Sequence, residues 1–147
     1  MSLRRWSTEG RLRSHVARQS EVSLLLASVE RDLADAQISE LSPDRRFATA
    51  YSTALGLATI ALRSSGYRAV GVGHHEVTIL SLPHTMGSAA TDRSRYLNAC
   101  RTKRNHVDYD GVGYATDADA DELISDAGVF REELIAWLTE QHPELIG

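Results

Sequence analysis

The sequence predicts an all-α protein, built as an up-and-down four-helix bundle with one additional short helix. Apolar residues recur at spacings of three and four over separate stretches, and residues that begin or end helices fall between these stretches. A length of 147 residues fits one domain and is awkward for two. We therefore expect an N-terminal arm or short helix over 1–19, the helical bundle over 20–142 and a C-terminal tail over 143–147.

The first two long helices are the clearest part of the N-terminal half. The first begins near Glu21 and ends before Ser42, and its apolar face is formed by Val22, Leu25, Leu26, Val29, Leu33 and Ala36. Ser42 and Pro43 begin the second, because serine accepts bonds from free amides and proline is tolerated at the first helical position. Gly66 suits the left-handed conformation that ends a helix.

The middle of the chain is predicted as a loop over 67–75, a short helix over 76–82 and a longer helix over 91–106. The loop contains two glycines and the pair His74-His75. Val77 and Ile79 would also suit a strand. We favour a helix there because no second strand is predicted to pair with it.

The last helix begins at Thr116 and ends at His142-Pro143. Its first turn carries several aspartates, which the positive end of a helix stabilises. The run Asp117-Ala118-Asp119-Ala120-Asp121 imitates the start of a calcium loop, but glutamate stands where such a loop needs glycine. Helix capping is the better interpretation, and we expect no metal and no cofactor.

Composition excludes several classes of protein. The net charge is −4, from 16 basic and 20 acidic side chains, which argues against a protein that coats DNA through overall charge. The one cysteine, Cys100, cannot form an internal disulfide. Without a membrane-length apolar run or a signal-peptide pattern, we expect a cytoplasmic protein with no membrane partner.

Positive charge is nevertheless concentrated in one predicted helix. Five cations fall within twelve residues: Arg93, Arg95, Arg101, Lys103 and Arg104. A guanidinium binds phosphate in a fixed fork, and the imidazole of His106 can exchange a proton near neutral pH. Arg101 and His106 do not share a helical face, so they converge only if the helix ends near His106 or a second subunit completes the site. The alternative is a solvated basic face whose arginines pair with the acidic last helix.

The run Arg101-Thr102-Lys103-Arg104-Asn105-His106, followed by Val107-Asp108-Tyr109-Asp110, resembles the motif of the HEPN superfamily, the helical "higher eukaryotes and prokaryotes nucleotide-binding" domains. The motif is an arginine followed four to six residues later by a histidine. The resemblance extends from Asp44 through Leu138 and includes His74-His75 before the short helix.

This resemblance implies a bundle that forms homodimers and brings the arginine and histidine of both subunits to one cleft. Many members look like metal-independent endoribonucleases of toxin–antitoxin or defence systems. Carried onto this chain, Arg101 would hold the phosphate and His106 would be the general acid or base. The substrate-binding residues would be His75, Arg104, Asn105, Asp108 and Tyr109.

Other members of the superfamily are similar to non-catalytic modules that bind a nucleotide or a partner protein, such as a nucleotidyltransferase or an antitoxin. Three hypotheses therefore stand beside one another. The basic segment cleaves or binds RNA, docks a partner, or pairs with the last helix and supports the fold.

Overall fold

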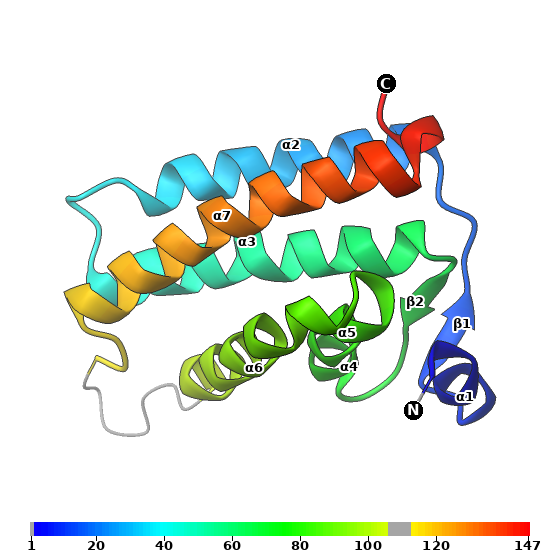
Figure 1. The fold of residues 1–147 in the computed structure, drawn as a ribbon. Coiled ribbons are helices and arrows are strands. Elements are labelled where there is room, and N and C mark those ends of the chain that lie inside the picture. Colours follow the sequence, from blue (N-terminus) through cyan, green and yellow to red (C-terminus); the bar gives the residue numbers. More distant parts are fainter. Residues whose placement is uncertain (1, 106–112) are drawn as a thin grey trace.

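The computed structural model describes residues 2–105 and 113–147 and confirms the all-α class (Figure 1). Four long helices make up most of the structure, and the described strands form one small sheet. In chain order the elements are α1 (Leu3–Thr8), β1 (Leu12–Ser14), α2 (Gln19–Ala36), α3 (Pro43–Ser64), β2 (Tyr67–Ala69), α4 (His74–Leu80), α5 (Leu82–Thr85), η1 (Ser88–Ala90), α6 (Thr91–Asn105), α7 (Asp117–Gln141) and η2 (Pro143–Leu145).

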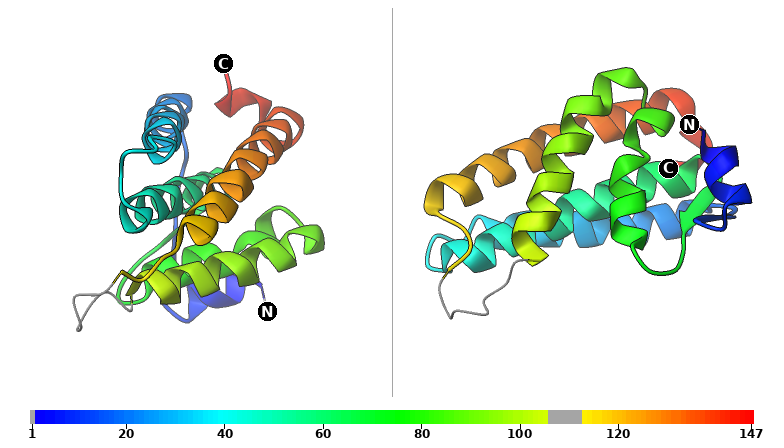
Figure 2. Two further views of the ribbon diagram at one scale, coloured as in Figure 1. Left: turned by 90° about the vertical axis from the view of Figure 1, so that its left-hand side faces the viewer. Right: turned by 90° about the horizontal axis from the view of Figure 1, so that it is seen from below.

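The long helices α2, α3, α6 and α7 alternate in direction along the chain (Figure 1). The axes of α2, α3 and α7 are roughly aligned, whereas α6 crosses the bundle obliquely (Figure 2). Helix α3 lies at the centre and buries residues around most of its circumference. Its side chains pack with those of α2, α6 and α7 in one core that includes Phe47, Leu57, Leu97 and Phe130.

Helices α2 and α3 approach closely because small residues lie between them. A Cβ atom at Gly56 would lie 3.0 Å from Cγ2 of Val29, which is closer than side chains normally pack. The buried alanines of α3, among them Ala50, Ala54 and Ala58, keep this helix narrow elsewhere in the same core.

The predicted helix ends are confirmed at three positions. Ser42 caps α3 by accepting a bond from the Arg45 amide at 3.3 Å, and Gly66 follows α3 with a φ of +99°. Thr116 begins α7 in a capping box, in which its hydroxyl and the Asp119 carboxylate each accept a bond from the other residue's backbone amide.

The predicted loop over 67–75 instead contains a strand and the first turn of α4. Strand β2 pairs antiparallel with β1, so that Leu12 lies opposite Ala69. Trp6 and Leu12 are 3% and 2% exposed and pack with Leu62. Residues 1–19 therefore include the expected short helix, but they also form a strand that fixes this segment against α3.

The short helix in the middle of the chain has different bounds from those predicted. It spans His74–Leu80 rather than 76–82, and a second turn, α5, follows it. Pro83 lies within the first two positions of α5, where the missing amide breaks no helical hydrogen bond. The expected C-terminal tail contains the turn η2, and Leu145 is buried against the core.

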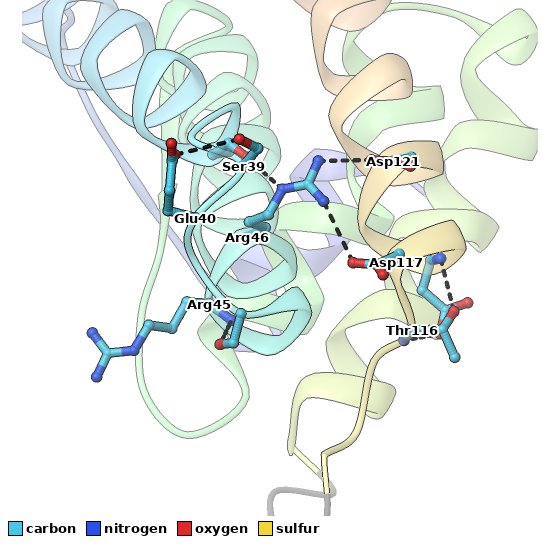
Figure 3. Close-up of polar contacts among 10 residues, drawn as sticks. Ser39, Glu40, Arg45, Arg46, Thr116, Asp117 and Asp121 are labelled. Atoms are coloured by element: carbon cyan, nitrogen blue, oxygen red, sulfur yellow. Dashed lines mark hydrogen bonds and ion pairs between the residues drawn. The ribbon is translucent and has the colours of Figure 1, made fainter.

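Arg46 joins the beginnings of α3 and α7 (Figure 3). Its Nε donates to the carbonyl oxygen of Ala36 at 3.2 Å, and its Nη2 donates to Oδ1 of Asp121 at 2.6 Å. The Nη1 atom lies 3.8 Å from a carboxylate oxygen of Asp117. The neighbouring Arg45 extends away from these groups (Figure 3).

Asp44 holds the chain where it enters α7. One of its carboxylate oxygens accepts bonds from the amides of Tyr114 and Ala115, at 2.9 and 2.8 Å. The Tyr114 hydroxyl in turn donates to the Asp44 carbonyl at 2.7 Å. None of the described helices is both long and apolar enough to span a membrane.

Candidate functional site

Two of the five cations of α6 are directed toward α7. Arg93 forms ion pairs with Asp126, at 3.2 Å, and with Glu133. Lys103 lies 2.9 Å from Asp119. For these two side chains, the predicted pairing with the acidic last helix is confirmed. Carboxylates of α7 neutralise their charges.

Arg101 lies on the opposite flank of α6 and faces α4. Its Nη2 donates to Oε2 of Glu76 at 2.7 Å, and its Nε donates to Oδ1 of Asn98 at 3.0 Å. The Arg101 side chain is 21% exposed, whereas that of Glu76 is 46% exposed. This guanidinium is therefore held in place by a carboxylate that water reaches easily.

Arg104 continues the buried stripe of α6. Leu97, Cys100 and Arg104 are separated by three and then four positions, so all three lie on one face of α6. The Arg104 side chain therefore turns inward toward α3. Its Cζ lies 5.7 Å from the centroid of the Tyr51 ring, within the range of a cation–π contact. The Nε atom is buried and has no hydrogen-bond partner among the described residues.

Tyr51 presents a second buried polar group beside Arg104. Its hydroxyl also has no hydrogen-bond partner within the described part of the chain. Burial raises the pKa of Tyr51 to about 12, although the charges of Arg101 and Arg104 act in the opposite direction. The hydroxyl thus stays protonated near neutral pH and is available as a donor.

His75 belongs to the same group of residues. Burial lowers the pKa of His75, and the charges of His74, Arg104 and Arg101 lower it further. At neutral pH its imidazole is therefore uncharged, with one nitrogen that donates and one that accepts. We call Tyr51, His75, Glu76, Arg101 and Arg104 the α6 cluster.

The structure brings together three of the sequence-predicted site residues, Arg101, Arg104 and His75. Asn105 is exposed at the last position of α6. His106, Asp108 and Tyr109 lie outside the described residues, so their roles stay predictions.

Sequence reasoning missed Tyr51 and Glu76. Tyr51 fits the apolar period of α3, which predicts a core residue rather than a site residue. Glu76 directly follows His75 in the sequence, and this was the one signal that could have pointed to it as a carboxylate partner for an arginine of the basic segment.

Cys100 is buried on α6, on the stripe that leads to Arg104. Burial raises the pKa of its thiol to about 11, which keeps it protonated and makes it a poor nucleophile at neutral pH. Over residues 2–105 and 113–147, no group of three or more histidine, cysteine, aspartate or glutamate side chains is placed to hold a metal ion.

The α6 cluster is chemically suited to an oxyanion. It offers two guanidinium groups and a phenol as donors, and a neutral imidazole that can donate or accept. Its one carboxylate, Glu76, engages a single arginine. An anion with several oxygens, such as a phosphate, would satisfy the donors that have no partner among the described residues.

Comparison with protein-family models, with curated proteins and with solved structures finds no match to this chain.

Proposed function

We propose that this chain is a HEPN-like, RNA-binding protein of the cytoplasm that holds a phosphodiester group in the α6 cluster. The observation that carries the proposal is the pair of buried donors, Nε of Arg104 and the hydroxyl of Tyr51, without partners among the described residues. A buried donor left unpaired costs about 1–3 kcal/mol of folding free energy. A phosphate oxygen bound between them would recover this energy.

Arg101 and Arg104 have different parts in this binding. Arg104 is positioned by the core and contributes a fixed guanidinium. Arg101 exchanges Glu76 for the phosphate, because the exposed carboxylate loses little when it returns to water. His75 contributes a neutral imidazole at the edge of the cluster.

The resemblance extends this proposal to cleavage, with His106 as the general acid or base. The ribose 2′-oxygen would attack the adjacent phosphorus and give up its proton to a base. The bond to the 5′-oxygen would break, and that oxygen would receive a proton. Arginine would stabilise the developing negative charge, and no metal is needed. A homodimer would complete the site if each subunit supplied part of it.

Binding is tested by fluorescence anisotropy with a labelled single-stranded RNA whose 2′-hydroxyls are replaced by fluorine, which prevents cleavage through the 2′-oxygen. We expect Arg104→Gln and Arg101→Gln each to weaken binding about tenfold, the effect of one charge-assisted hydrogen bond. The matched control is Arg95→Gln, on the exposed side of the same helix. Equal affinities for all four proteins, or an equal loss in the control, would contradict the proposal.

Cleavage is tested separately with unmodified RNA in the presence of a chelator. The expected product ends in a 2′,3′-cyclic phosphate, and His106→Ala and Arg101→Ala should abolish its formation. Arg104-dependent binding without any cleavage would leave RNA binding as the function and remove catalysis from it.

A protein partner is the second candidate, because two exposed apolar side chains line the same cavity. Val16 is 84% exposed and Leu24 is 72% exposed, beside a cavity of about 500 Å³ between the N-terminal segment and α2. Copurification of the native complex, followed by Leu24→Asp, tests this candidate. A wild-type protein that purifies as an isolated monomer would argue against both a partner and the homodimer.

A further inference from the structure

A second basic site lies next to the α6 cluster. A cavity of about 190 Å³ opens between α3, β2 and α4, and we call it the α3–β2–α4 pocket. Its polar lining consists of Thr59, Arg63, Arg68, His74, His75 and Thr78. These side chains include two guanidinium groups and two imidazoles but no carboxylate. His75 lines the pocket and also belongs to the α6 cluster, so the two sites are continuous.

Of the two arginines that line the pocket, Arg68 is the one without a carboxylate partner among the described residues. It is exposed and forms no ion pair with any described residue. In the ladder of β1 and β2 it lies directly opposite Arg13, which is also exposed. Like charges facing each other across two strands are unfavourable, so an anion bound here would relieve their repulsion.

Arg63 adds N–H donors to the pocket, and His74 adds an imidazole. One guanidinium nitrogen of Arg63 donates to Glu21 at 2.9 Å, and no other N–H group of Arg63 bonds to a described residue. The Nδ1 atom of His74 lies 3.1 Å from the carbonyl oxygen of Gly71. Because a carbonyl only accepts, Nδ1 carries a proton, and Nε2 is an acceptor in the neutral ring and a second donor in the imidazolium.

We propose that the α3–β2–α4 pocket binds a terminal phosphate monoester of a ribonucleotide chain, with the neighbouring phosphodiester on the α6 cluster. The inference rests on the proposed function and specifies its substrate. A phosphate monoester carries nearly two negative charges at neutral pH, which suits Arg68 together with the N–H groups that Arg63 does not use for Glu21. The pocket is smaller than the usual range for whole small ligands, about 300–1,000 Å³, which favours the end of a strand over its interior.

Isothermal titration calorimetry with three 2′-fluoro tetrauridylates tests this inference. One carries a 5′-phosphate, one a 3′-phosphate and one neither. We expect the wild type to bind one of the phosphorylated forms about tenfold more tightly than the unphosphorylated form, the effect of one charge-assisted contact. Adenosine monophosphate is the fourth probe, and its binding in the pocket would show that a free nucleotide suffices.

Arg68→Gln should remove this preference while leaving the affinity for the unphosphorylated strand unchanged. The matched control is Arg45→Gln, which removes the same charge from an exposed position near the start of α3, about 27 Å along that helix from Arg63. It should leave the preference intact.

The outcomes separate the two proposals. Equal affinities for the three strands would overturn the terminal-phosphate site, and so would a preference that persists in Arg68→Gln. In either case, sensitivity of the unphosphorylated strand to Arg104→Gln would leave the proposed function standing. If the preference for a phosphorylated strand depends on Arg68 but Arg104→Gln leaves RNA affinity unchanged, the pocket is supported and binding at the α6 cluster is refuted.

Discussion

Replacing Arg46 with alanine should destabilise the fold, because this one side chain connects three helices. It reaches the last carbonyl of α2 from the first turn of α3 and pairs with two aspartates of α7 (Figure 3). Its side chain is only 14% exposed, so water replaces these contacts poorly.

The size of the effect follows from the environment of each contact. The bond to Ala36 is partly buried and involves a charged donor, which is worth about 1.5–3 kcal/mol. Asp121 and Asp117 are 65% and 80% exposed, so each ion pair contributes about 0–1 kcal/mol. The sum is about 1.5–5 kcal/mol, which corresponds to a fall in Tm of about 5–15 °C for a chain of this length.

Urea unfolding followed by far-ultraviolet circular dichroism measures this loss directly. Arg45→Ala is the matched control, since Arg45 is exposed on the same turn and should change stability by less than about 0.5 kcal/mol. In high salt the loss of unfolding free energy in Arg46→Ala should shrink only by the part that the two aspartate ion pairs contribute. A deficit equal to that of Arg45→Ala, or one that salt removes entirely, would refute the assignment to the Ala36 bond.

Three further predictions concern stability and its pH dependence. Burial alone would raise the pKa of Glu21, but hydrogen bonds from His15 and Arg63 outweigh burial and lower this pKa below 4.5. Glu21→Gln should therefore lower the free energy of unfolding at pH 7 by about 1–2 kcal/mol. The difference between the variant and the wild type should disappear as the pH falls below about 4, because Glu21 is then protonated in the folded protein too. A deficit that stays constant down to pH 3 would contradict this. Gly56→Val should destabilise by about 1–3 kcal/mol because its side chain would press on Val29, and an unchanged urea midpoint would show that α2 can shift. Tyr51→Phe removes an unpartnered buried hydroxyl and should leave Tm unchanged or higher while weakening RNA binding; a lower Tm would mean that the hydroxyl is satisfied in the folded protein.

Much of the helical structure could be predicted because its signals are local. The caps at Ser42 and Thr116 and the apolar stripes depend on residues within one or two turns. The β1–β2 pair could not be found in this way. Each strand has three residues, too few to show a period of two, and the partners are separated by more than fifty positions.

The candidate site could be predicted along α6 but not across to α3 and α4. The basic run was visible, yet four of its five cations contact three different helices and the fifth, Arg95, is exposed. The spacing from Leu97 to Arg104 does predict an inward guanidinium. Its position over Tyr51 depends on how α6 crosses α3, which is set by packing between distant parts of the chain.

The inward position of Arg104 implies opposing selection pressures. On the stripe that it shares with Leu97 and Cys100, an aliphatic side chain would fill the space without leaving a buried polar atom unpaired. A library varied at this codon and screened for resistance to heat or proteolysis should therefore enrich leucine or methionine. The same library screened for RNA retention should keep arginine, so the two enrichment profiles should diverge at this position.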